Sequence, residues 1–391
     1  MTARRIVLIA SSYAPHVGGV ETHVAEVARE LVARGDEVEV WTVDRGERPA
    51  IAGPAGWQAG TAETGPDAVV VRYLPTPLPA RRVASAARFV VRAPGAWRRW
   101  GQAHRRFRPD VLHVHCFGPN GLYALALHRR FGTPLVVTSH GETRGDDEDV
   151  FAQSALLRRG LRAALSRAAA VTAPSEYVLD DLRSRFGLSG GEVVPNGVAP
   201  ALEVTAAPLE GRYIATVRRL GWMKGVDLLV SAFALARDQG RIDPEVRLAI
   251  GGDGPERERL AAQIRAAGLD DVVVMLGWQE QAGVAALVAG AEAVVVPSRD
   301  EAFGIAALEA WRGGSPLIMT TRGGAAEFLT DDVDALLVDP EDTEALAAAL
   351  QRVTSEPALR ARLAAAGSDR VRAFTWSRVA GEYARIHDAV S

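Results

Sequence analysis

Residues 213–230 read YIATVRRLGWMKGVDLLV, and this stretch contains the unit from which the fold can be predicted. Its first five residues are a short apolar run, which is typical of a buried parallel strand. A loop with two arginines and a lysine follows, and a segment with apolar residues at helical spacing begins at Val226. A strand that leads through a loop into a helix predicts one unit of a parallel α/β sheet.

The same alternation extends in both directions. Before this stretch we expect strands at residues 5–10, 37–42, 68–73, 111–115, 135–138, 169–172 and 192–194, and helices at 20–34, 120–131 and 152–169. After it begins we expect strands at 213–217, 246–250, 272–276, 293–296, 316–319 and 335–338, and helices at 226–238, 255–267, 282–290, 302–312 and 343–352. Strands that alternate with helices predict parallel sheets covered on both faces.

The chain has 391 residues, a length that suggests two domains. A stretch rich in Pro and Ala at residues 198–209 reads as a linker between the two sets of elements. We therefore expect two doubly wound, Rossmann-like domains, residues 1–200 and 201–373, that face each other. Because ligands of open parallel sheets bind at the carboxyl ends of the strands, we expect the site in the cleft between the domains.

Composition excludes several classes of protein. Apolar residues make up 48% and charged residues 24%, which argues against a disordered or collagen-like chain. The single cysteine, Cys116, excludes an internal disulfide and a cysteine-based zinc site. No apolar run approaches a transmembrane helix in length, and the first residues lead into a strand rather than a signal peptide. The sequence therefore predicts a cytoplasmic protein.

Nine arginines and no carboxylate lie in residues 81–108, although the net charge of the chain is only −3. The simplest interpretation is a solvated helix face. The alternative is peripheral contact with an anionic membrane, which a basic segment favours. Nucleic acid is not expected, because no nucleic-acid module and no interleaved aromatic residues accompany the arginines.

Lys224 is the only lysine in a chain whose other basic residues are all arginine. It lies five residues after Arg219, on the loop between a predicted strand and helix. A guanidinium fork and a compact ammonium on one loop can converge on a diphosphate. The plain alternative is a surface lysine, which this position makes less attractive.

A second candidate element is DEAFGIAALE, residues 300–309, which follows a predicted strand. Glu301 lies in the loop, Glu309 lies two helical turns further on, and Phe303, Gly304 and Ile305 open the helix between them. Ionised carboxylates accept hydrogen bonds from hydroxyls, such as those of a sugar or a ribose, and a helix N-terminus suits a phosphate. Isolated glutamates of this kind are otherwise usually solvated helix charges.

Further candidates lie at the ends of other predicted strands. Gly18 and Gly19 open a helix and would let the backbone approach a ligand, and His140 ends a strand. Loops at Gly251 and Gly277 end strands of the second domain. None of these loops matches Gly-x-Gly-x-x-Gly, so a nicotinamide oxidoreductase is not favoured.

Taken together, these motifs resemble one family. The chain is similar to the retaining, nucleotide-sugar-dependent glycosyltransferases of the GT-B fold, the family 4 group often called glycosyl transferases group 1. The resemblance covers nearly the whole length, through the segments GGVE (18–21), PDVLHVH (109–115), HG (140–141), PNGV (195–198), Arg219 to Gly225, GDGP (252–255), Glu301 to Glu309 and FTW (374–376). The sequence departs where Ala302 and Ala199 replace the Gly and Asp common in this family.

The resemblance implies a role for each position. Arg219 and Lys224 would hold the donor diphosphate, with Gly18 and Gly19 closing on it. Glu309 would bind the ribose, Glu301 and the Phe303–Gly304–Ile305 backbone the donor sugar, and the Gly251 and Gly277 loops the base. His140 would approach the sugar ring. The first domain would bind the acceptor, through loops near 46–67, 75–108 and 142–155, and a C-terminal helix at about 374–391 would pack back onto it.

The resemblance implies sugar transfer from a UDP- or GDP-sugar to a sugar, lipid-linked or small-molecule hydroxyl. It implies retention at the anomeric carbon and no cofactor or metal, since Arg219 and Lys224 would take the place of a cation. No carboxylate is an obvious nucleophile, so a same-face, ion-pair-like substitution is the better hypothesis. Two alternatives stay open, a UDP-sugar 2-epimerase of similar architecture and a non-catalytic partner subunit.

Overall fold

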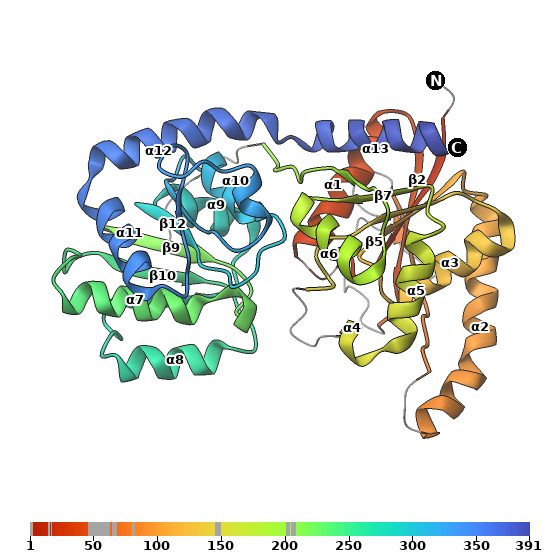
Figure 1. The fold of residues 1–391 in the computed structure, drawn as a ribbon, viewed down its shortest axis with the longest axis horizontal. Coiled ribbons are helices and arrows are strands. Elements are labelled where there is room, and N and C mark those ends of the chain that lie inside the picture. The colour runs from red at the N-terminus through yellow and green to blue at the C-terminus, as the bar shows by residue number, and fades with distance from the viewer. Residues whose placement is uncertain are drawn as a thin grey trace. The chain divides into compact units, whose positions relative to one another are not determined.

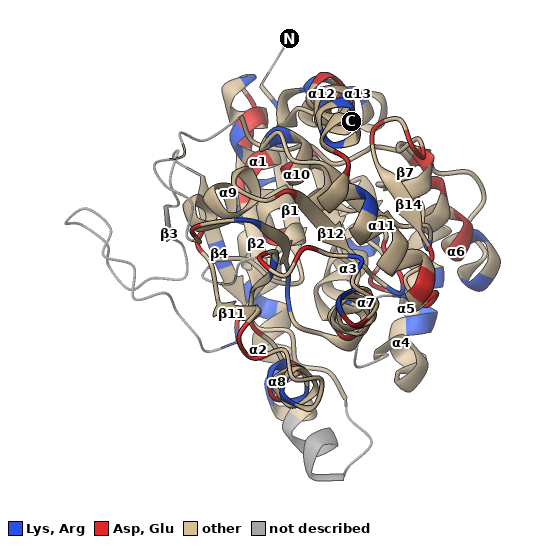
Figure 2. Cartoon of the chain, turned by 90° about the vertical axis from the view of Figure 1, so that its left-hand side faces the viewer, with Lys and Arg blue, Asp and Glu red and all other residues tan. Residues whose placement is uncertain are grey.

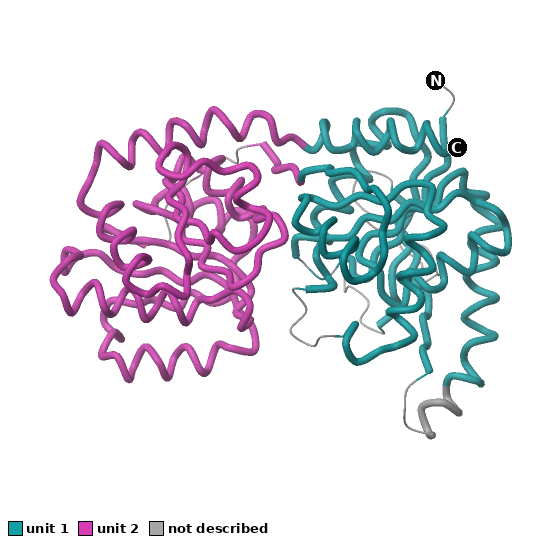
Figure 3. The backbone as a smooth tube through the Cα atoms, in the orientation of Figure 1, with its two compact units in different colours: residues 1–195, 376–391 teal, residues 196–375 magenta. Residues whose placement is uncertain are grey.

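The computed structural model describes residues 3–14, 16, 18–45, 63–64, 69–79, 83–144, 150–200, 204 and 209–391. The chain divides into two compact units (Figure 3), one of residues 1–195 with 376–391 and one of residues 196–375. The chain thus crosses between the units after Pro195 and again after Thr375. Much of the expected loop 46–67 and of the expected linker 198–209 lies outside the described residues.

Unit 1 is built on an eight-stranded sheet in the order β3-β4-β2-β1-β5-β6-β7-β8. Its strands are β1 (Arg5–Ala10), β2 (Glu37–Val43), β3 (Glu63–Thr64), β4 (Val70–Leu74), β5 (Val111–His115), β6 (Leu135–Thr138), β7 (Ala170–Ala173) and β8 (Glu192–Val193). All pairings are parallel except that of β3 with β4. Residues 6–10 of β1 are fully buried, as expected for a central strand covered on both faces.

The helices of unit 1 cover this sheet (Figure 1). They are α1 (Gly19–Ala33), α2 (Val83–Phe107), α3 (Pro119–Phe131), α4 (Val150–Gln153), α5 (Ala155–Leu165), α6 (Glu176–Phe186) and the C-terminal α13 (Trp376–Val390). α13 packs along α1, while α3 packs against both α2 and α5. The last helix of the chain therefore belongs to the first sheet and not to the second.

Unit 2 contains a six-stranded parallel sheet in the order β11-β10-β9-β12-β13-β14. The strands are β9 (Tyr213–Val217), β10 (Arg247–Gly251), β11 (Val273–Gly277), β12 (Ala293–Val296), β13 (Leu317–Thr320) and β14 (Leu336–Val338). This is the doubly wound order 3-2-1-4-5-6, in which the direction of winding reverses between the first and fourth strands. The reversal lies between β9 and β12.

Helices lie on both faces of the second sheet (Figure 1). One buried cluster joins the strands to α7 (Val226–Asp238), α8 (Arg257–Ala266) and α11 (Thr343–Ser355). The other joins them to α9 (Gln281–Ala289) and α10 (Ile305–Arg312), with fully buried Trp311 among its members. α12 (Pro357–Arg370) and the short 3-10 helices η2 (Trp222–Lys224), η3 (Gly324–Glu327) and η4 (Val371–Ala373) complete the unit.

The expected strands are present, mostly within one or two residues of their predicted bounds, but two helical predictions need correction. The single helix expected at 152–169 is two helices, because the Ser154 hydroxyl accepts a hydrogen bond from the Leu157 N–H and starts α5 afresh. Residues 83–107, which we expected to supply acceptor loops and also weighed as a solvated helix face, form the long helix α2, so the helical interpretation is correct and the loop expectation is wrong.

Charged residues are spread unevenly over the helices. α6 and α8 carry both signs of charge (Figure 2), as solvated helices usually do. α2, in contrast, contains six arginines and no Asp or Glu. Among the described residues, no helix combines the length and the apolar character needed to cross a membrane.

Candidate functional site

The candidate site of unit 2 lies at the point where the winding of its sheet reverses. β9 and β12 are hydrogen-bonded neighbours, so the loops that follow them leave the same edge of the sheet side by side. The first loop carries Arg218, Arg219 and Lys224, and the second carries Ser298 and Glu301. A reversal point of this kind is where open α/β sheets bind their ligands.

Two glycines allow neighbouring loops at this edge to approach closely. Gly225 has a φ of +65°, and a Cβ there would lie 1.9 Å from the carbonyl oxygen of Pro297 in the loop after β12. Gly252 has a φ of +124°, and a Cβ there would lie 1.9 Å from the carbonyl oxygen of Arg218. Larger residues at either position would push the loops apart.

Four side chains meet where the two loops approach. The Lys224 Nζ lies 3.2 Å from Glu301 Oε2, and Ser298 donates a 2.8 Å hydrogen bond to the same oxygen. Arg218 donates to Ser298 Oγ at 2.8 Å and to the Lys224 carbonyl at 3.2 Å, and its Nη2 lies 3.8 Å from Glu301 Oε2. We call Arg218, Lys224, Ser298 and Glu301 the switch-point cluster.

The electrostatics of the cluster keep Glu301 ionised. Burial by itself would raise the pKa of Glu301, but Lys224, Arg218 and the Ser298 hydroxyl together hold it below its ordinary value. Burial also lowers the pKa of Arg218, whose Nε is buried without a hydrogen-bond partner among the described residues. An acceptor-only carboxylate is therefore fixed beside two cations, one buried and one partly exposed.

Arg219, which we expected to act with Lys224, is placed differently from Arg218. Its side chain is exposed, and within the described part of the chain it forms no side-chain hydrogen bond or ion pair. It lies on the same loop as Lys224 and remains a prediction for diphosphate binding. Arg218, which the sequence reasoning passed over, is the arginine that contacts the cluster.

The N-terminus of α10 lies between Glu301 and Glu309. Gly304 is the N-cap of this helix and Ile305 its first residue. The Ala307 N–H donates to the Gly304 carbonyl at 2.9 Å, whereas the N–H groups of Ile305 and Ala306 have no helix carbonyl to bond. Phe303 is buried and stacks on Phe328, which makes its side chain part of the core and leaves only its backbone as a candidate ligand. Glu309 is half-buried, and burial raises its pKa, although Arg312 and Arg218 act against this.

The two remaining glycine loops of unit 2 lie side by side. Gly251 ends β10 and Gly277 ends β11, and the two residues are paired in the sheet. The Gly252 N–H donates a 2.7 Å hydrogen bond to the Gly277 carbonyl, which ties the loops together. Because β10 neighbours β9, both loops leave the sheet at the same edge as the switch-point cluster.

In unit 1, His140 is held by a buried carboxylate. Glu142 accepts hydrogen bonds of 2.8 Å from the His140 N–H, the Ser139 hydroxyl and the Phe117 N–H. These bonds join the loop after β6 to the loop after β5. Burial raises the pKa of Glu142, while the three donors act to lower it. Glu142 thus fixes the backbone that presents His140.

His140 also belongs to a group of histidines. Its Nε2 lies 3.2 Å from His115 Nδ1, and its ring packs against that of His23 at 4.6 Å between centroids. Nitrogens of His23, His115 and His140 lie within 4.8 Å of one another, close enough for three ligands of a metal ion. His23 is already hydrogen-bonded to Tyr383 of α13 at 3.2 Å, so we interpret the group as a hydrogen-bonded network. Burial lowers the pKa of His140 well below its ordinary value, which keeps its ring neutral at pH 7.

Gly18 and Gly19 lie at the N-terminus of α1, which directly follows the loop after β1. Gly18 has an extended backbone that any residue can adopt, and a Cβ there would meet only the flexible end of Glu21. The backbone conformation of unit 1 therefore does not require glycine at position 18. That Gly18 and Gly19 let a ligand approach the backbone stays a prediction.

Comparison with known proteins decides the family. The sequence profile described as Glycosyltransferase Family 4 matches residues 17–202, and that described as Glycosyl transferases group 1 matches residues 201–370. A D-inositol 3-phosphate glycosyltransferase from Frankia alni is 31% identical over 387 residues, which cover 93% of this chain and 92% of that protein. The chain belongs to the group 1 glycosyltransferases of the GT-B fold.

Other relatives and solved structures are similar to this glycosyltransferase. A glycogen synthase from Mycobacterium tuberculosis is 30% identical over 299 residues, 72% of this chain and 69% of that protein. The sucrose-phosphate synthase of Thermosynechococcus elongatus has the same fold, with a TM-score of 0.79 at 23% identity and 98% coverage of both chains. Anabaena HepE, solved with UDP and glucose, gives a TM-score of 0.71 at 20% identity, again with 98% coverage of both chains.

Sequence reasoning missed three polar residues that organise the two candidate sites. Arg218 and Ser298 complete the switch-point cluster, and Glu142 holds His140. Arg218 carried a usable signal, since an arginine at the carboxyl end of a predicted strand points toward the ligand edge of the sheet. Ser298 and Glu142 carried none, because a serine or a glutamate in a loop is common.

Proposed function

We propose that this glycosyltransferase transfers a sugar from a nucleoside diphosphate sugar, UDP- or GDP-linked, to an acceptor hydroxyl with retention at the anomeric carbon. The observation that carries the proposal is the switch-point cluster, where Arg218, Lys224 and Glu301 meet at the ligand edge of a doubly wound sheet. Cations beside a helix N-terminus suit a diphosphate, and an ionised carboxylate suits sugar hydroxyls.

The cluster is suited to release Lys224 toward a bound diphosphate. In the structure, Lys224 is paired with Glu301 at 3.2 Å. When a diphosphate draws the ammonium away, Glu301 keeps the hydrogen bond from Ser298 and the nearby charge of Arg218. The carboxylate would therefore stay ionised and free to accept a hydroxyl of the donor sugar.

The proposed chemistry breaks the bond between the anomeric carbon and the diphosphate oxygen and forms a bond from the acceptor oxygen on the same face. The acceptor proton passes to the departing diphosphate, so no protein carboxylate is needed as a nucleophile. Negative charge grows on the leaving group, and Lys224, Arg219 and the first N–H groups of α10 would stabilise it most. These fixed charges would serve in place of a divalent metal.

The acceptor class is suggested by the relatives. Several of them are named D-inositol 3-phosphate glycosyltransferase, so D-inositol 3-phosphate is the first acceptor to test. The two alternative functions, epimerisation of a UDP-sugar and a non-catalytic partner role, have no supporting observation.

The test is a panel of UDP-, GDP- and dTDP-sugars with the full chain, with and without D-inositol 3-phosphate and with and without EDTA. We expect nucleoside diphosphate release from at least one donor, undiminished by EDTA, and a product whose NMR coupling shows the donor's anomeric configuration. An inverted product would contradict retention, and loss of activity in EDTA would contradict metal independence. Epimerised donor, or binding without turnover, would favour one of the alternatives.

A further inference from the structure

Three helices of unit 1 that pack side by side carry arginines and no carboxylate. α2 contains six arginines, α3 two and α5 three, and none of these helices contains Asp or Glu. α3 packs against both α2 and α5, so their outer sides form one surface, which we call the basic face. Helices α6 and α8 of the same chain mix both signs, so arginine richness alone does not explain the basic face.

The central arginines of the basic face are available to a partner. Arg98 and Arg99 of α2, Arg129 and Arg130 of α3 and Arg159 of α5 are all exposed. Within the described part of the chain, none of them forms a side-chain hydrogen bond or an ion pair. No described residue therefore compensates their charges, and uncompensated positive charge attracts an anionic surface.

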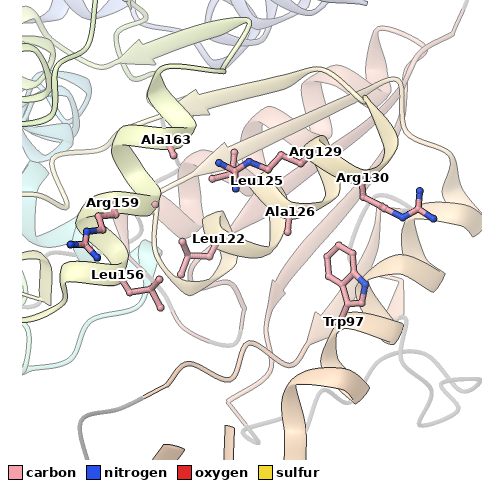
Figure 4. A pocket seen from close by; sticks show the side chains of 10 residues that line it. Trp97, Leu122, Leu125, Ala126, Arg129, Arg130, Leu156, Arg159 and Ala163 are labelled. Atoms are coloured by element: carbon pink, nitrogen blue, oxygen red, sulfur yellow. The ribbon is translucent and has the colours of Figure 1, made fainter. Parts of the chain in front are cut away.

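A pocket of about 680 Å³ lies in the middle of the basic face. Trp97 of α2, Leu122 and Leu125 of α3 and Leu156 of α5 supply its apolar lining. Arg129 and Arg130 of α3 and Arg159 of α5 belong to the same lining (Figure 4). The volume is in the range of pockets for small ligands, and the lining combines apolar surface with positive charge.

Apolar side chains are also exposed on the basic face. Val90 and Val91 of α2 are 68% and 80% exposed, and Leu156 of α5 is 42% exposed at the pocket. Exposed apolar side chains among uncompensated arginines match a ligand that is anionic at one end and apolar at the other. Such a pattern is the property of a helix that lies in a membrane interface.

We propose that the basic face docks on a bilayer that contains anionic phospholipid, and that its pocket seats the phosphate and the adjoining acyl chain of one lipid. The expectation from residues 81–108 alone concerned one segment, whereas the structure adds α3, α5 and the pocket. The proposal goes beyond the proposed function, because it concerns where the enzyme works and not what it transfers. Binding at the basic face can therefore be tested apart from catalysis.

The test is co-sedimentation of the full chain with two kinds of vesicle. One kind is phosphatidylcholine alone, and the other adds about 30% phosphatidylglycerol to make the surface strongly anionic. We expect binding to the anionic vesicles only, weakening as salt is raised. Arg129→Glu with Arg130→Glu should weaken it by more than about thirtyfold, because losing two basic residues near an anionic surface already costs that much and the two added carboxylates repel it further. The matched control is Arg265→Glu with Arg372→Glu, which makes the same charge change at exposed positions of unit 2 and should bind as wild type does.

A second arm tests the pocket with a monomeric short-chain phosphatidylglycerol. We expect it to bind the wild-type chain, to bind Ala126→Trp at least about tenfold more weakly because the indole fills the pocket, and to resist displacement by inorganic phosphate. Equal binding to neutral and anionic vesicles, or equal loss in the two double variants, would overturn the proposal. Donor hydrolysis should be unchanged in Arg129→Glu with Arg130→Glu. A failure of the membrane-docking proposal can therefore be told apart from a failure of the proposed sugar transfer.

Discussion

Replacing Lys224 by alanine should separate catalysis from stability. The Lys224 side chain is 35% exposed, so solvent screening limits its pair with Glu301 to about 1 kcal/mol or less. Glu301 would keep Ser298 at 2.8 Å and Arg218 at 3.8 Å, so no buried charge is left uncompensated. Turnover, however, should fall about 10²–10³-fold, the usual loss when one preorganised charge-stabilising group is removed, or about 2.7–4 kcal/mol.

The assay pairs two measurements on the same variant. Donor turnover is followed by nucleoside diphosphate release, and the free energy of unfolding is followed by urea denaturation. Arg265→Ala, at an exposed position of α8, serves as the matched loss of a cation and should change neither. Turnover of Lys224→Ala within twofold of wild type, or a stability loss as large as its loss of transition-state stabilisation, would refute the reasoning.

Three further changes test other contacts. Arg218→Met should lower the free energy of unfolding by about 1–3 kcal/mol, because Ser298 Oγ and the Lys224 carbonyl lose a buried donor while Glu301 keeps Lys224 at 3.2 Å. Arg218 helps to hold the pKa of Glu301 low, so wild type loses stability as the pH falls below the ordinary glutamate pKa. This acid-induced loss should be smaller in Arg218→Met. Urea denaturation at several pH values would check both effects. Glu309→Ala should weaken binding of free UDP or GDP, whereas Glu301→Ala should mainly reduce turnover of the full donor; calorimetry and kinetics that show no such division would contradict the assigned roles. Glu142→Gln should keep most of the fold but lower turnover about tenfold or more, because the amide can no longer accept all three bonds that fix the His140 loop, and unchanged kinetics would exclude this positioning role.

The fold could be predicted from sequence because each strand is a short apolar run bounded by a loop. β1 and β9 are fully or almost fully buried, so their composition leaves little alternative to a central parallel strand. α2 was harder, since Pro94 and Gly95 interrupt its helical pattern. The helix boundary at Ser154 could not be predicted from the sequence. A serine within a helical pattern caps a new helix only where tertiary packing ends the previous one.

The site was predictable where a residue type is rare or its spacing is unusual. Lys224 was found because it is the only lysine, and Glu301 because it precedes a helix at the end of a strand. The contact between them, at 3.2 Å, depends on β9 and β12 being neighbours in the sheet, which the order of strands in the sequence does not give. Arg218, and not Arg219, contacts Glu301. Side chains of consecutive residues at the end of a strand point in opposite directions, and the sequence does not show which of the two faces the cluster.

Calorimetric titration of UDP and GDP into the wild-type chain and into Lys224→Ala tests the central claim most directly. If the switch-point cluster holds the donor diphosphate, at least one nucleotide binds the wild-type chain, Lys224→Ala binds it at least about tenfold more weakly, and the matching nucleoside shows no such difference. If Lys224→Ala binds the nucleoside diphosphate as tightly as the wild-type chain does, the diphosphate is held elsewhere and the account of this site is wrong.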